Sequence, residues 1–264
     1  MKAALCLSGN FREYNRTLPS ILKFIEHFKL CDVFIIYDIT EKEEDLNNII
    51  NYLKPTKCKS VTSMDVCNNL NMWYKIKESF LLCKEYCKEN NFLISNYYDI
   101  VIRCRFDLIL ENDLNFNNII VDPNTLYYGS ISDTLFRNIQ KLSYLSKKFL
   151  LDEFFFGAPE LVEKYFLFYD IILKSSNKCL EYGLGETDFF FYSKVLGTTL
   201  KKIQFHYIMY QWKDNLIGYT QKKWKNYPAL KNGFFSNKGT VVVVLLIVFM
   251  ILYIRELINK YLKK

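Results

Sequence analysis

The chain has 264 residues, 50% hydrophobic and 17% aromatic, which is enough apolar surface to bury one good core but short for two. Its net charge of +7 comes from the C-terminal end, because residues 222–264 carry nine Lys or Arg against one Glu and residues 1–221 sum to −1. A domain without net positive charge is poorly suited to bind a phosphate backbone, so we expect no nucleic-acid partner for it.

Hydrophobic periodicity predicts strands and helices in alternation along the first 210 residues. Strands are expected at 2–8, 32–38, 57–62, 99–106, 125–129, 152–157 and 202–209, and helices at 17–29, 43–53, 70–90, 135–149, 159–174 and 185–196. This order predicts an α/β fold, with a mainly parallel sheet sandwiched by helices.

The chain is expected to divide into four parts. An α/β domain over residues 1–221 precedes a basic linker at 222–238, a transmembrane helix at 239–255 and a short basic tail at 256–264. No signal peptide is expected, because the apolar run at the N-terminus is short and is interpreted as the first strand.

A glycine turn follows this strand, with the sequence Ser-Gly-Asn at residues 8–10. Arg12 and Arg16 follow, Thr17 is a candidate N-cap, and Pro19 would lie in the first turn of the helix. A glycine turn with arginines and a helix N-terminus suits an anionic ligand. Neither the dinucleotide nor the P-loop glycine motif is present, and an ordinary strand-to-helix connection is an equal interpretation.

The stretch YYDIVIRCRFDLIL, residues 97–110, carries charges near the end of an apolar strand. In an extended chain Arg103, Arg105 and Asp107 share one face, and the opposite face is apolar. They approach the carboxyl edge of the sheet, where ligands bind in open α/β folds. The structural alternative is that Asp107 only pairs with one of the two arginines and holds a loop.

Two further acidic clusters could line a site. Asp152 and Glu153 precede a Phe-Phe-Phe strand, where they could bind sugar hydroxyls or simply begin the strand. Glu186 and Asp188 follow a glycine-rich stretch near a predicted helix start. These two residues are either active-site carboxylates or helix-capping acids.

The eight cysteines are interpreted as free thiols, because several fall inside apolar strand patterns and none forms a CxxC pair. Only two histidines are present, so a structural zinc site is not expected. This usage indicates a reducing compartment.

Three stretches in order, ALCLSGNFR, YYDIVIRCRFDLIL and DEFFFGAPELVEKY followed by GLGETDFFFY, resemble glycosyltransferase-like proteins with a GT-A-type fold. Such proteins include WavE-like proteins of polysaccharide-synthesis loci and proteins of large DNA viruses. The resemblance spans residues 2 to 210 approximately. It implies a GT-A-like sheet and the transfer of a sugar from a nucleoside-diphosphate sugar to a glycan or other acceptor hydroxyl, including one on a protein.

The resemblance also implies roles for particular residues. The nucleotide would be bound by Ser8, Gly9, Asn10 and Arg12, and the phosphates by Arg103 and Arg105. Asp107 would hold a divalent cation, Mg²⁺ or Mn²⁺, or the ribose. The transfer site would be lined by Asp152, Glu153, Glu186 and Asp188.

This sequence departs from the usual Asp-x-Asp metal motif, because Arg105 stands two residues before Asp107. An arginine there can replace the charge of a metal ion on a diphosphate. A different class of function is also open, that of a catalytically inactive, tail-anchored adaptor with the same fold. A third class is nucleic-acid binding by the lysines of residues 222–238. Anionic lipid is the favoured partner of these lysines.

The C-terminal segment predicts a membrane anchor, because no charged residue lies between Gly239 and Ile254. These 16 residues would span about 24 Å as a helix, against about 30 Å of bilayer core. A helix apolar on all sides belongs in lipid or in a core, and a buried C-terminal helix is the alternative. Five lysines precede the span, against a charge of +3 after it, so we expect a single-pass protein whose N-terminal domain faces the cytosol.

This anchor is testable by fusion. Residues 222–264 joined to a soluble reporter should carry it to membranes, because a helix that is apolar on all sides is unfavourable in water. Truncation after Lys238 should release a soluble, folded domain. Fractionation of cells measures both. A reporter that stays soluble would favour the buried helix.

Overall fold

The computed structural model describes residues 1–12, 14–63, 68–110, 116, 119–131, 153–174 and 192–209. All of these residues belong to one compact unit, Met1–Tyr210. Within the described ranges no helix has the length and apolarity needed to cross a bilayer, and the predicted span at 239–255 lies outside those ranges.

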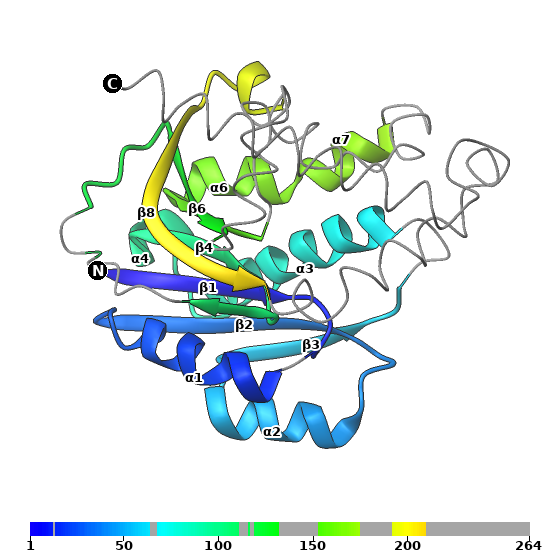
Figure 1. The fold of residues 1–264 in the computed structure, drawn as a ribbon. Coiled ribbons are helices and arrows are strands. Elements are labelled where there is room, and N and C mark those ends of the chain that lie inside the picture. Colours follow the sequence, from blue (N-terminus) through cyan, green and yellow to red (C-terminus); the bar gives the residue numbers. More distant parts are fainter. Residues whose placement is uncertain are drawn as a thin grey trace, which may run out of the picture. The chain divides into compact units, whose positions relative to one another are not determined.

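The described strands form one sheet of eight, in the order β3-β2-β1-β4-β7-β6-β8-β5 (Figure 1). Their bounds are β1 Lys2–Ser8, β2 Leu30–Asp38, β3 Lys57–Val61, β4 Ile100–Cys104, β5 Leu108–Leu110, β6 Thr125–Ile131, β7 Phe154–Gly157 and β8 Thr199–Met209. Strands β3, β2, β1 and β4 run parallel, whereas β7 is antiparallel to both β4 and β6. Strand β8 is parallel to β6 and antiparallel to β5. The predicted α/β fold with a mainly parallel sheet is therefore confirmed.

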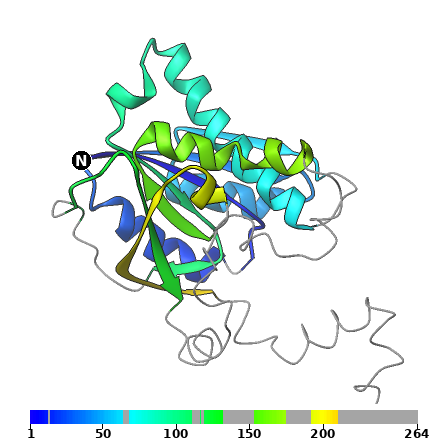
Figure 2. The same cartoon turned by 90° about the horizontal axis from the view of Figure 1, so that it is seen from above.

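Helices cover both faces of the sheet (Figures 1 and 2). Their bounds are α1 Tyr14–Ile25, α2 Glu43–Leu53, α3 Asn68–Glu89, α4 Ile94–Tyr97, α6 Pro159–Phe166 and α7 Phe168–Lys174. Helices α1 and α2 pack on one face, and α3, α6 and α7 pack on the other. The predicted helix 159–174 is thus two helices divided at Leu167, whereas the predicted helix 135–149 lies outside the described residues.

Alternation along the central strands supplies both cores. Leu5 and Leu7 of β1 point into the core beneath α1 and α2, while Cys6 points into the core beneath α3. All five residues of β4 are buried. The predicted apolar face is confirmed, because Ile100, Ile102 and Cys104 lie in one core and Val101 lies in the other. The opposite face is buried as well: Arg103 is 1% exposed, because helices cover both faces of a central strand.

Strand β7 is the aromatic centre of the sheet. Phe154 and Phe156 belong to the core under α1 and α2, and Phe155 belongs to the other, with none of the three exposed. Pro159 then begins α6, where its missing N–H leaves no helical bond unmade.

Helix α1 begins one turn earlier than expected. Tyr14, Leu18 and Ile21 form a buried stripe at helical spacing, and the Tyr14 hydroxyl accepts a hydrogen bond from Asn48 of α2 at 3.1 Å. Thr17 is therefore no N-cap: its hydroxyl donates to the Tyr14 carbonyl inside the helix, at 3.3 Å, and Pro19 is interior. Tertiary packing has overridden the local start signals.

Candidate functional site

The carboxyl ends of β1 and β4 form the topological switch point of the sheet. The chain leaves β1 through α1 toward β2 on one side, and it enters β4 from α3 on the other. Helices α1 and α3 lie on opposite faces, and the strand order reverses between β1 and β4, since β2 and β3 lie on one side of β1 and β4 on the other. Ligands of open α/β sheets bind in the crevice at such a switch point.

The first loop leaves β1 at this point. Ser8 is fully buried, and its hydroxyl has no hydrogen-bond partner among the described residues. Gly9 has φ +139°, a conformation that L side chains rarely adopt, and an added Cβ would meet no atom within 4 Å. Asn10 and Arg12 are exposed. The loop therefore offers an open turn and a buried hydroxyl at the strand end.

The side chain of Arg103 links β4 to this loop by hydrogen bonds. Its Nη1 donates to the Ser8 carbonyl at 3.0 Å and to the Cys104 carbonyl at 2.5 Å. Since the residue is 1% exposed, this guanidinium fixes the carboxyl ends of β1 and β4 together. Its predicted contact with phosphates remains a prediction.

Arg105 and Asp107 form a two-bond ion pair just past the end of β4. Nε of Arg105 donates to Oδ1 of Asp107 at 2.8 Å, and Nη2 donates to Oδ2 at 2.6 Å. Asp107 is 4% exposed, whereas the Arg105 side chain is 23% exposed and so reaches the surface. This is the pairing that the sequence left open as the structural alternative, in the bidentate form that orients a guanidinium best.

A divalent cation finds no ready site among these residues. Both oxygens of Asp107 accept from Arg105, and the described ranges contain no group of three His, Cys, Asp or Glu side chains able to hold a metal. Within the described residues Asp107 is thus paired with Arg105, and the Mg²⁺ or Mn²⁺ that the resemblance implies stays a prediction.

Glu153 lies at the same edge. It immediately precedes β7, whose register pairs Phe154 with Cys104 of β4, so the next step along both strands sets Glu153 opposite Arg105. The residue is 6% exposed. The other three predicted acids, Asp152, Glu186 and Asp188, lie outside the described residues.

A second ion pair at this edge was missed by the sequence reasoning. Asp38 ends β2 and accepts from Lys75 of α3 at 2.9 Å, with both side chains less than one tenth exposed. It also accepts from the hydroxyl and backbone N–H of Thr40 and from the hydroxyl of Ser63. An aspartate that ends an apolar strand, LCDVFIIYD, was the available signal, but its partner is 37 residues away.

These contacts set the protonation of Asp38 and its neighbour. Burial alone would raise the pKa of Asp38, but hydrogen bonds from Ser63, Lys75 and Thr40 outweigh it and hold the pKa well below its usual range. With four donors on two oxygens the carboxylate is saturated, so it holds the loops after β2 and β3. Burial raises the pKa of Glu41, and the backbone amide of Phe11 in the first loop only partly offsets this.

The sequence matches no family model and no curated protein. Solved structures with a similar fold include the galactosyltransferase LgtC in complex with donor and acceptor sugar analogs, at 9% identity and a TM-score of 0.45, covering 76% of this chain and 72% of that one. The mannosyltransferase PcManGT from Pyrobaculum calidifontis, in complex with GDP-Man and Mn²⁺, has 9% identity and a TM-score of 0.49. The match covers 84% of this chain and 60% of that one. The glycosyltransferase GlyE of Streptococcus pneumoniae has 10% identity and a TM-score of 0.42, covering 87% and 52%.

At TM-scores below 0.5 and identities near 9%, these similarities concern the backbone alone. Any activity has to be inferred from the residues at the sheet edge.

The buried Asp38–Lys75 pair makes a prediction for stability. Lys75→Met leaves a buried carboxylate without its counter-ion and should cost about 3–5 kcal/mol of unfolding free energy. Lys59→Met is the matched control: Lys59 is 52% exposed in its pair with Glu78, so its loss should cost less than about 1 kcal/mol. Thermal unfolding of both variants measures the difference.

The same pair predicts a pH dependence. Because the folded pKa of Asp38 is lowered, its contribution is present above the ordinary value of 3.8 and is lost as the pH falls from there toward the folded pKa. Lys75→Met should flatten this acid-side loss. Equal stability losses in the two variants, or an unchanged acid profile, would refute the role given to the pair.

Proposed function

We propose that this chain is a glycosyltransferase that moves a sugar from a nucleoside-diphosphate sugar to a hydroxyl of a glycan or protein acceptor. One observation carries the proposal. The first three stretches that resemble glycosyltransferases fall on β1, β4 and β7, which are adjacent in the sheet and reach the same edge, whereas residues 183–191 of GLGETDFFFY lie outside the described residues. Segments far apart in the sequence thus meet where a ligand of this fold class binds.

The donor would lie over the first loop. The open turn at Gly9, with Asn10 and Arg12 exposed beside it, leaves room for the nucleotide. Arg105, oriented by Asp107 and partly exposed, faces the same edge and supplies positive charge for the departing diphosphate. Arg103 holds the first loop against β4 through its hydrogen bond to the Ser8 carbonyl.

The reaction requires a base as well as this charge. The oxygen of the acceptor hydroxyl attacks the anomeric carbon, the bond from that carbon to the diphosphate oxygen breaks, and the diphosphate leaves with the electron pair. The hydroxyl proton passes to a carboxylate. Among the predicted acids Glu153 lies at this edge, and Asp152, Glu186 and Asp188 remain candidates. Glu41, whose pKa is raised by burial, is a further one.

The membrane segment belongs to the same proposal. Residues 239–255 would tether the transferase, with the lysines of 222–238 on anionic lipid and the α/β domain in the cytosol.

Calorimetry with the full-length protein and a panel of UDP- and GDP-sugars tests the function. We expect one donor to bind without added metal, because Arg105 already supplies the charge, and titrations with Mg²⁺ and Mn²⁺ show what a cation adds. Folded protein that binds no nucleotide sugar under any of these conditions would favour the inactive adaptor.

Asp107→Asn separates positioning from scaffolding. The amide keeps the volume but removes the charge that orients Arg105, so donor turnover should fall by roughly 100-fold or more, with only a small loss of melting temperature. Glu163→Gln is the matched control, since Glu163 forms an exposed ion pair with Lys84 at 2.6 Å, and it should leave turnover unchanged. A large drop in melting temperature with turnover reduced only in proportion would give Asp107 a purely structural role.

A further inference from the structure

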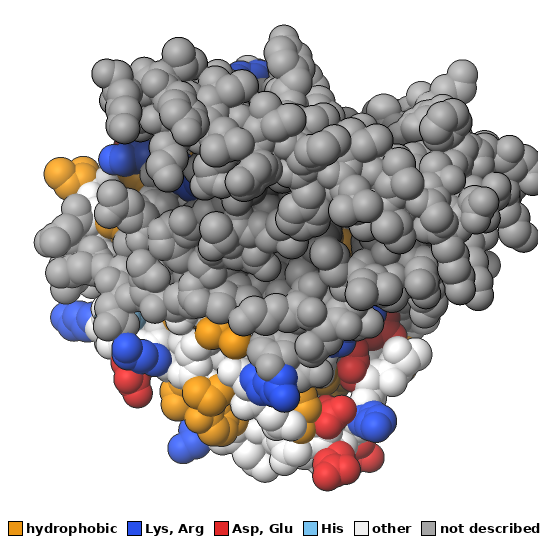
Figure 3. Space-filling view, in the orientation of Figure 1, with side chains coloured by type: hydrophobic (Ala, Val, Ile, Leu, Met, Phe, Trp, Pro, Cys, Tyr) orange, Lys and Arg blue, Asp and Glu red, His pale blue; other side chains and the backbone are white. Residues whose placement is uncertain are grey.

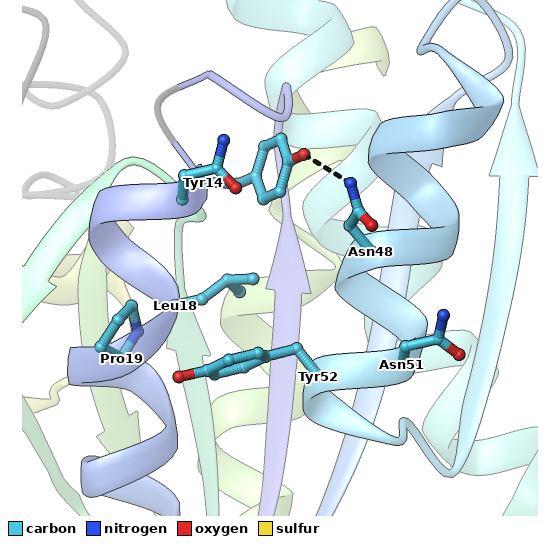
Figure 4. A pocket seen from close by; sticks show the side chains of 7 residues that line it. Tyr14, Leu18, Pro19, Asn48, Asn51 and Tyr52 are labelled. Atoms are coloured by element: carbon cyan, nitrogen blue, oxygen red, sulfur yellow. Dashed lines mark hydrogen bonds between the residues drawn. The ribbon is translucent and has the colours of Figure 1, made fainter.

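A groove of about 450 Å³ lies between α1 and α2, and no residue that lines it belongs to a strand (Figure 4). Its volume falls within the range of small-molecule sites, roughly 300–1,000 Å³. Its lining includes Tyr14, Asn15 and Pro19 of α1 and Asn48, Asn51 and Tyr52 of α2. None of the residues that line it is charged.

Hydrogen-bonding groups in this groove are available to a ligand. Asn48 Nδ2 donates to the Tyr14 hydroxyl at 3.1 Å, which leaves the hydroxyl its own proton to donate. The side chains of Asn15, Asn51 and Tyr52 make no hydrogen bond within the part of the chain that the structure describes. Each asparagine amide offers a donor and an acceptor together.

An aromatic ring completes the lining. Tyr52 is 45% exposed, and Figure 4 shows it extending from α2 toward Pro19 on α1, with the Tyr14–Asn48 pair at the other end of the groove. A half-exposed ring gives a flat apolar surface with a polar tip, which suits a ligand that is apolar on one side and hydroxylated on the other.

The surrounding surface argues against a charged partner. Figure 3 shows Lys, Arg, Asp and Glu side chains of both signs scattered among hydrophobic and uncharged ones over the described part of this face. The acids of the first turn of α2, Glu43, Glu44 and Asp45, do not line the groove. With no charge in its lining, the groove lacks what a phosphate, a metal ion or an anionic lipid surface requires.

We infer that this groove binds a neutral saccharide chain. Hydroxyl groups donate and accept together, as the asparagine amides do, and the C–H face of a pyranose ring matches the exposed face of Tyr52. An extended peptide also presents donors and acceptors in pairs, but its side chains would not use the single flat ring. The inference stands on the groove's own lining, so it holds whether or not the strand edge transfers a sugar.

Saturation-transfer NMR on the full-length protein tests the groove, with maltotriose, cellotriose and chitotriose as neutral probes and an uncharged extended peptide alongside. We expect at least one trisaccharide to bind and the peptide not to. Tyr52→Ala and Asn51→Ala should each weaken that binding about tenfold, because they remove the ring and one amide. Phe92→Ala is the matched control, an aromatic side chain 39% exposed in the α3–α4 connection, and should leave binding unchanged.

Three results would overturn the inference. They are no saturation transfer to any trisaccharide, a loss of trisaccharide binding in Phe92→Ala equal to that in Tyr52→Ala, or preferential binding of the peptide. Donor affinity separates the groove from the strand edge. Tyr52→Ala should leave nucleotide-sugar binding intact, and a parallel loss of both ligands would make the groove part of the donor site. A chain that binds the trisaccharide but no nucleotide sugar would retain the groove and lose the proposed transferase.

Discussion

The buried guanidinium of Arg103 is the contact on which the strand edge depends. A charge that is 1% exposed costs free energy to desolvate, and hydrogen bonds to the carbonyls of Ser8 and Cys104 compensate that cost. Both carbonyls belong to the last residues of their strands. The residue that satisfies them also fixes where the first loop leaves β1 and where the chain turns after β4.

Paired charges then stiffen this edge on both sides of β1. Asp38–Lys75 ties the end of β2 to α3, and Arg105–Asp107 closes the turn after β4. The two pairs differ in what remains available to a ligand. Asp38 is saturated by protein donors, whereas Arg105 is partly exposed and oriented by a nearly buried carboxylate. Charge held in place before a ligand arrives needs no reorganisation during a reaction, which is why the second pair suits a developing diphosphate.

Local pattern predicted much of the fold. Strand β1 and helix α2 have the expected bounds, because an unbroken apolar run and a strong helical periodicity need no distant partner. The predicted bounds were wrong where tertiary contacts determine the ends of an element. The first turn of α1 is stabilised by Asn48 of α2. Strand β4 ends at Cys104, whose carbonyl accepts a hydrogen bond from Arg103. Sequence pattern could place Arg105 and Asp107 at a sheet edge but could not choose between ligand contact and mutual pairing. The Asp38–Lys75 pair could not be predicted, because the two residues are 37 positions apart and their contact depends on the strand order.

The two proposals assign different kinds of recognition to the strand edge and to the α1–α2 groove of one α/β unit. Binding at the edge would use fixed charge from Arg105 and from the exposed Arg12, so salt would screen it where solvent reaches the ligand. Binding in the groove would use neutral amides and one aromatic face, on which ionic strength has little effect. The groove lining offers a diphosphate donor no positive charge, so the chemistry of the two linings would direct such a donor to the strand edge.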